Sequence, residues 1–200
     1  MTVSINGTDL ISLAGYKTRA GISSSSEDSK LEAIIDSVSQ LVKTYCGVSF
    51  VDFYSQPKTE YLSNMYSTHL IPLTESPVRN IQSVKERSSP TQEYKVLSEN
   101  SDYVLDSTTD SLFRVQGTGY ASWASGPNSV QVTYTAGYEA LPKDLLLAVV
   151  DLITYYHKNE QKARQTIAGA TLQNNSTTSH SDHIGFPDHI KRILDLYKVL

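Results

Sequence analysis

A strand-like segment joined to a long helical segment, Ser129–Lys158, constrains the fold of this chain more than any other feature. Ser129–Tyr134 alternates β-branched or aromatic residues with polar ones, which is typical of a strand with one buried face. Gly137 then permits a turn, and Pro142 suits a first helical turn because its missing N–H has no helical partner there. Asp144 places negative charge near the positive end of the helix. The sequence therefore predicts a strand, a turn and a helix in immediate succession.

The predicted helix runs from Pro142 to about Arg164 and carries an apolar stripe. Its apolar residues recur at three- and four-residue steps: Leu145, Leu146, Val149, Leu152, Ile153 and Tyr156. A lone helix could not keep such a stripe in water, so we expect it to pack against another element.

A second long helix is predicted after the serine run Ser23–Ser26, whose hydroxyls can cap free amides, with Gly47 as its left-handed stop. Its stripe comprises Leu31, Ile34, Ile35, Val38, Leu41, Val42 and Tyr45. A short helix is expected upstream, within Asp9–Ala20, before the break at Gly21.

The segment between the long helices is rich in Tyr, Val, Thr and Ser and is cut by prolines, which favours short strands and turns. We expect a hairpin around Ser107–Asp110. The predicted strands are Val48–Tyr54, Thr59–Leu62, His69–Leu73, Val78–Arg87, Tyr103–Asp106, Ser111–Val115 and Ser129–Tyr134.

The predicted fold class is α+β. N-terminal and C-terminal helices pack as a small helical bundle, and short antiparallel strands form a β-rich insertion between them. One domain over residues 1–200 is expected from the length. Its predicted parts are a first helix region at 22–47, the β-rich insertion at 48–135, a second helix at 142–166, a flexible loop at 167–186 and a C-terminal helix at 187–200.

Charge and cysteine content limit the possible classes of function. The net charge of −4 and the isoelectric point near 5.7 give no global basic field that would attract DNA or anionic lipid. Cys46 is the single cysteine, so no disulfide can form within the chain, and a reducing cytoplasm is expected. No apolar run is long enough to span a bilayer, and the first residues lack the pattern of a signal peptide, so neither membrane insertion nor secretion is expected.

Candidate catalytic and metal-binding residues form no recognised pattern. His180, Asp182, His183 and His189 could supply zinc ligands, but their spacing fits no compact ligand motif, and solvated polar residues are the preferred interpretation. No serine lies in a G-x-S-x-G elbow, and the glycines near Gly117 belong to no phosphate-binding motif. We therefore expect no enzyme activity, no catalytic residues, no metal and no cofactor.

Tyrosine outnumbers phenylalanine by 13 to 4, and tyrosine suits half-exposed surfaces and protein interfaces. Tyr155 and Tyr156 are the most informative pair. Adjacent helical positions diverge by roughly 100°, so both rings cannot enter the same stripe, and one must meet another element or another chain.

The order of these segments resembles the head–tail connector, or adaptor, family of tailed phages. The resemblance covers roughly Ile22–Leu200, and its most specific part is the strand–Gly–Tyr–Pro–helix joint followed by the closing helix. The matching segments are Tyr45–Gly47, Leu73–Val78, Ile81–Val84, Val132–Tyr138, Leu141–Pro142, Tyr155–Tyr156 and Phe186–Tyr197.

The resemblance implies a structural virion protein at the head–tail interface, assembled in the host cytoplasm. Family members form a ring, usually of twelve copies, docked beneath the portal protein, which joins capsid to tail and extends the DNA channel. The implied partners are the portal, neighbouring copies and a tail or neck completion protein. DNA passes through the lumen without sequence-specific binding.

Two segments are the candidates for partner binding under this resemblance. The polar segment Ile167–Gly185 is expected to fold on assembly, and the last helix is the second candidate for docking. The candidate residues are Tyr155, Tyr156, Gln173, Asn174, Asn175, His180, His183, Lys191, Arg192, Tyr197 and Lys198.

Two alternatives stay open at this point. The chain could be another neck or tail completion protein. It could also be a β-rich module that binds carbohydrate or a receptor, with Trp123 and Tyr120 as a stacking platform.

Overall fold

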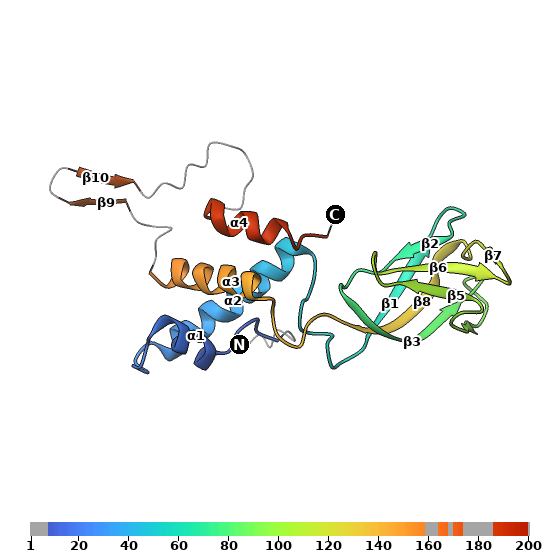
Figure 1. The fold of residues 1–200 in the computed structure, drawn as a ribbon, viewed down its shortest axis with the longest axis horizontal. Coiled ribbons are helices and arrows are strands. Elements are labelled where there is room, and N and C mark those ends of the chain that lie inside the picture. Colours follow the sequence, from blue (N-terminus) through green and yellow to red (C-terminus); the bar gives the residue numbers. More distant parts are fainter. Residues whose placement is uncertain (1–7, 159–163, 168–169, 174–185, 200) are drawn as a thin grey trace. The chain divides into compact units, whose positions relative to one another are not determined.

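A computed structural model describes residues 8–158, 164–167, 170–173 and 186–199. The chain divides into two compact units, one made of Met1–Gly47 with Leu141–Leu200 and the other of Val48–Ala140. The first is the helical unit and the second is the strand unit (Figure 1). The predicted α+β class, with terminal helices and a β-rich insertion, is confirmed. A single domain over residues 1–200 stays a prediction.

The helical unit contains four helices, α1 (Leu13–Ala20), α2 (Asp28–Cys46), α3 (Lys143–His157) and α4 (Asp188–Asp195), among the described residues. Figure 1 shows α3 beside both α2 and α4, and each of these pairs is in contact. The shared core is apolar and consists of Leu31, Ile35, Val38, Val42, Cys46, Leu145, Val149, Leu152, Ile153, Ile190 and Leu194. The stripes predicted for the two long helices therefore bury one another.

Some of the predicted helix ends are confirmed by the structure and one predicted cap is wrong. Gly21 and Gly47 end α1 and α2 in the left-handed conformation, at φ 67° and 74°. The predicted serine cap of α2 is wrong, because Glu27 holds the N-cap position and no side chain bonds the free amides. Ser24 and Ser26 instead bond each other, at 2.9 Å.

The second long helix is shorter than predicted. α3 ends at His157, and the residues predicted as its last turn contribute to β9 (Arg164–Ile167), which pairs antiparallel with β10 (Ala170–Gln173). Part of the predicted loop at 167–186 is therefore a hairpin. The other residues of that loop, 168–169 and 174–185, lie outside the described residues.

The strand unit consists of two antiparallel sheets around one core. The first sheet has the order β1 (Lys58–Asn64), β8 (Gly126–Ala136), β3 (Val78–Glu86) and β4 (Lys95–Leu97). The second has the order β2 (Leu70–Pro72), β6 (Ser111–Gln116) and β5 (Tyr103–Asp106), and β7 (Gly119–Tyr120) pairs with β6. Side chains from both sheets form the core, including Val84, Val132, Tyr134, Ile71 and Leu112, and Trp123 joins them from the segment between β7 and β8.

Most predicted strands are present, and the alternation along β8 is confirmed by the burial of Val130, Val132 and Tyr134. The hairpin across Ser107–Asp110 is also confirmed, since β5 and β6 pair antiparallel, from Tyr103 opposite Arg114 to Asp106 opposite Ser111. The sequence missed the short strands β4 and β7.

The strand predicted at Val48–Tyr54 is wrong. Phe50 has a positive φ of 60°, which a regular strand does not allow. The Glu75 carboxylate accepts hydrogen bonds from the Ser49 N–H at 2.8 Å and from the Ser49 hydroxyl at 3.0 Å. These bonds hold the segment in turns, because its amides bond a side chain and nearby carbonyls instead of a neighbouring strand.

The thiol of Cys46 is enclosed by the helical core. Its sulfur lies 3.6 Å from the Leu194 carbonyl oxygen, and burial raises its pKa to about 12. Because the thiolate is the nucleophile, we expect no reaction with iodoacetamide at about pH 8 in the native protein, and full reaction in denaturant. Mass spectrometry of the alkylated protein measures the extent of labelling. Labelling of the native protein at about pH 8, at the rate of a free thiol, would contradict the packing of α4 on α2.

Candidate partner-binding site

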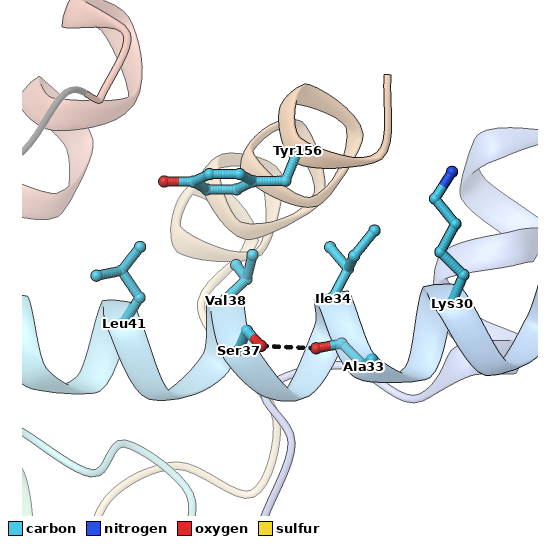
Figure 2. Close-up of a pocket in the computed structure, with 7 residues that line it drawn as sticks. All are labelled: Lys30, Ala33, Ile34, Ser37, Val38, Leu41 and Tyr156. Atoms are coloured by element: carbon cyan, nitrogen blue, oxygen red, sulfur yellow. Dashed lines mark hydrogen bonds between the residues drawn. The ribbon is translucent and has the colours of Figure 1, made fainter. Parts of the chain in front are cut away.

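An open apolar groove lies on the helical unit along α2. Its volume is about 600 Å³. Figure 2 shows α2 as its floor, with the Tyr156 side chain reaching over from α3. The lining residues are Lys30, Ala33, Ile34, Ser37, Val38, Leu41 and Tyr156.

The groove exists because the apolar face of α2 is wider than the surface that α3 and α4 cover. Ile35, Val38 and Val42 are buried in the core, whereas Ile34 and Leu41, one step around the helix, are only half-buried. Residues three and four apart share a helix face, so Lys30, Ala33, Ile34, Ser37 and Leu41 form a second stripe beside the core stripe. Tyr156 is the one side chain outside α2 that lines the groove over this second stripe in the described part of the chain.

The polar atoms of the groove are few. The Ser37 hydroxyl donates to the Ala33 carbonyl oxygen at 2.7 Å, as Figure 2 shows, so it needs no partner from outside. Burial, followed by the neighbouring Tyr155 phenol, raises the pKa of Tyr156, which keeps the ring neutral. The groove therefore offers an apolar surface to a partner, with one charged group at its end.

That charged group is the Lys30 ammonium, whose side chain is 48% exposed. Glu27 lies 3.6 Å from it, and the same carboxylate is 2.8 Å from Nε2 of His157. The hydrogen bond from His157 and then the charge of Lys30 lower the pKa of Glu27. Glu27 thus joins the C-terminal end of α3 to the N-terminal end of α2, and Lys30 keeps nearly half of its surface in solvent.

The structure does not bring the sequence-predicted partner-binding residues into one site. The Tyr155 and Tyr156 rings contact each other edge to face at 5.5 Å, at the C-terminal end of α3. The Tyr197 hydroxyl donates to the Asp144 carboxylate at 2.8 Å, at the opposite end of the same helix. Eleven residues separate Asp144 from Tyr155, a rise of roughly 16 Å.

The other predicted residues belong to α4, to the residues after it and to the segment between α3 and α4. Lys198 lies over the Tyr45 ring, 5.1 Å from its centre, and Arg192 is exposed. Lys191 is half-buried. Gln173 is in β10, and the remaining predicted residues, Asn174, Asn175, His180 and His183, lie outside the described residues.

Sequence reasoning missed the groove residues apart from Tyr156. Ile34 and Leu41 were assigned to the core stripe, and no local pattern in α2 separates them from its buried residues.

The stacking platform of the carbohydrate-binding alternative is not present. Trp123 is 2% exposed, and its indole N–H donates to the His69 carbonyl oxygen at 3.1 Å. Tyr120 is exposed, and its ring lies beside Phe113 and His69. The indole predicted to stack on a sugar is therefore part of the core.

No three His, Cys, Asp or Glu residues lie close enough to hold a metal within the described ranges. In the same ranges, no helix combines the length and the apolar character needed to cross a membrane.

Solved structures share this fold of a helical unit with an inserted two-sheet unit. A subunit in the neck of an empty gene transfer agent (GTA) particle, computed with C6 symmetry, is similar with a TM-score of 0.60 and 15% identity, over 96% of this chain and 90% of the other. A subunit in the neck of the native GTA particle, computed with C12 symmetry, is similar with a TM-score of 0.55 and 14% identity, over 96% and 94%.

The family model for head completion proteins matches residues 9–200, and the chain belongs to this family. The head completion protein of Escherichia phage T5 is 23% identical over 197 residues, which cover 94% of this chain and 98% of the relative. The protein is therefore a structural component of the phage head-to-tail neck, and the predicted resemblance to head–tail connectors is confirmed. The family is one of structural proteins and not a known class of enzyme.

Proposed function

We propose that copies of this protein form a ring beneath the portal, join the capsid to the tail and extend the DNA channel. The observation that carries this proposal is the likeness of nearly the whole chain to neck subunits of a particle whose neck has been computed with C6 and C12 symmetry. A ring forms when the same head-to-tail contact repeats between copies and the rotation closes. The proposed assembly site is the host cytoplasm, and the proposed partners are the portal, neighbouring copies and a tail or neck completion protein.

The charge of the chain is consistent with a channel through which DNA slides. Proteins that hold duplex DNA neutralise its phosphates with lysine and arginine. This chain has 17 such residues against 21 acidic ones. A ring with this balance would enclose DNA without binding it tightly or reading its sequence.

The segment after α3 and the last helix are the proposed contacts with the portal. Arg192 of α4 is exposed, and Lys198, three residues after the end of α4, is also exposed and lies over the Tyr45 ring. Both cations can therefore contact an acidic surface without first breaking a buried ion pair. We keep Tyr155, Gln173, Asn174, Asn175, His180, His183, Lys191 and Tyr197 in this proposed contact set.

Light scattering after size exclusion tests the proposal. The chain has a mass of 22.1 kDa, and we expect a monomer when it is alone at low concentration. With the cognate portal we expect a complex in which about twelve copies of the chain bind each portal. A closed ring with cyclic symmetry contains a fixed number of copies. The portal of an unrelated phage is the control. A chain that stays at 22.1 kDa with its own portal at every concentration would contradict the ring.

A further inference from the structure

We infer that the groove along α2 receives Leu147 of the neighbouring copy, so that groove and Leu147 are the two halves of the contact that closes the ring. This inference rests on the proposed ring and specifies which surfaces meet in it. A head-to-tail ring needs two different patches on each copy, because one patch binds the preceding copy and the other binds the following copy. The helical unit carries two such patches.

The first patch is the groove, a hollow of about 600 Å³ with apolar walls and the Lys30 ammonium at one end. The second patch is Leu147 of α3, an aliphatic side chain that is 56% exposed. One is concave and the other protrudes, and both are apolar. Burying them against each other removes both from water, which stabilises the contact.

Leu147 lies on the side of α3 that points away from the groove, which runs along α2. Tyr156, which reaches over the groove, follows Leu147 by nine positions, and nine steps of 100° place the two side chains about 180° apart around α3. A copy therefore cannot fill its own groove with its own Leu147. Two separate patches on each copy allow a head-to-tail contact to pass from one copy to the next around a ring.

Charge complementarity supports the pairing. Asp151 lies one turn after Leu147 on the same face of α3, and its carboxylate has no ion-pair partner among the residues that the structure describes. Lys30 lies one turn before Ile34 on α2. The pairs Leu147–Asp151 and Ile34–Lys30 therefore have the same spacing, about 5–6 Å between Cβ atoms. If Leu147 packs on Ile34 with the two helices antiparallel, Asp151 meets Lys30.

Charge reversal tests this pairing in the full-length protein with its portal. Lys30→Glu and Asp151→Lys each place like charges together, and we expect each to raise the concentration for half-assembly about tenfold or more. The variant that carries both reversals restores opposite charges and should assemble near the wild-type concentration. Glu32→Lys is the matched control, because Glu32 is exposed on α2 about 200° around the helix from Lys30, and it should assemble normally.

A second measurement does not depend on charge. Ile34→Cys together with Leu147→Cys should give a ladder of covalent multimers when assembled rings are treated with a short bis-maleimide, because Cys46 is buried and unreactive. Circular dichroism and thermal melting establish that each variant is folded. Normal assembly of both single reversals, or the absence of a ladder in intact rings, would overturn this interface and leave the proposed ring in place. If wild-type protein forms no ring, the proposed function and this inference both fail.

Discussion

Replacing Gly137 by alanine should unfold the strand unit or come close to doing so. Gly137 has a φ of 94°, where residues with a side chain are strained. A Cβ built there would stand 2.9 Å from the Phe50 carbonyl carbon and still closer to its oxygen. Backbone atoms cannot move aside as a flexible side chain does, and the Phe50 oxygen also accepts a hydrogen bond from the Tyr138 N–H at 2.7 Å. We expect a loss of about 4 kcal/mol or more in the free energy of unfolding.

Urea denaturation followed by tryptophan fluorescence measures this loss, since Trp123 belongs to the same unit and is the single tryptophan. Gly117→Ala is the matched control. It also changes a glycine with positive φ, 60°, but no atom lies within 4 Å of the added Cβ. It should therefore cost only about 1–2 kcal/mol, the conformational penalty alone. Equal losses in the two variants would show that the close approach to Phe50 contributes nothing.

The parts of the fold that the sequence predicted are those set by neighbouring residues. The alternation in β8 and the glycine stops of α1 and α2 are local patterns, and each has one low-energy solution. The family resemblance also depended on such patterns, since it combined the end of α2, the β8–α3 joint and α4 in one order.

The errors occurred where distant residues decide the local structure. Val48–Tyr54 has the composition of a strand, but Glu75, 26 residues after Ser49, supplies the hydrogen bonds that hold this segment in turns. The charge of that buried carboxylate is balanced by Lys58, at 2.9 Å. No local pattern indicates which lysine will meet which glutamate, so the sequence could not predict this arrangement.

The candidate site was predictable only in part for the same reason. Tyr156, predicted in the apolar stripe, lines the groove, and a partner for either adjacent tyrosine stays a prediction. The sequence could not indicate that α3 and α4 leave Ile34 and Leu41 uncovered, because coverage depends on the angles between helices. An apolar stripe therefore predicts burial without specifying whether the covering element belongs to the same copy.

Replacing Trp123 by alanine should destabilise the strand unit by about 3–5 kcal/mol, the usual cost of emptying a core position of this size. Its ring is 2% exposed among the side chains that both sheets contribute to the core, and the Arg114 guanidinium lies 5.8 Å from its centre. The substitution also leaves the His69 carbonyl oxygen without the indole N–H that bonds it. Far-ultraviolet circular dichroism during thermal unfolding measures the loss, because the variant has no tryptophan to follow.

Tyr120→Ala is the control that separates packing from surface binding. Its side chain is 72% exposed on β7, three residues before Trp123, so removal should change the free energy of unfolding by no more than about 0.5 kcal/mol. A glycan-binding platform would require the opposite pattern, with both variants folded and both unable to bind. A stable Trp123→Ala variant would contradict the core position of the indole. If this variant instead unfolds, any loss of binding that it shows reports the lost fold, and only Tyr120→Ala tests the surface.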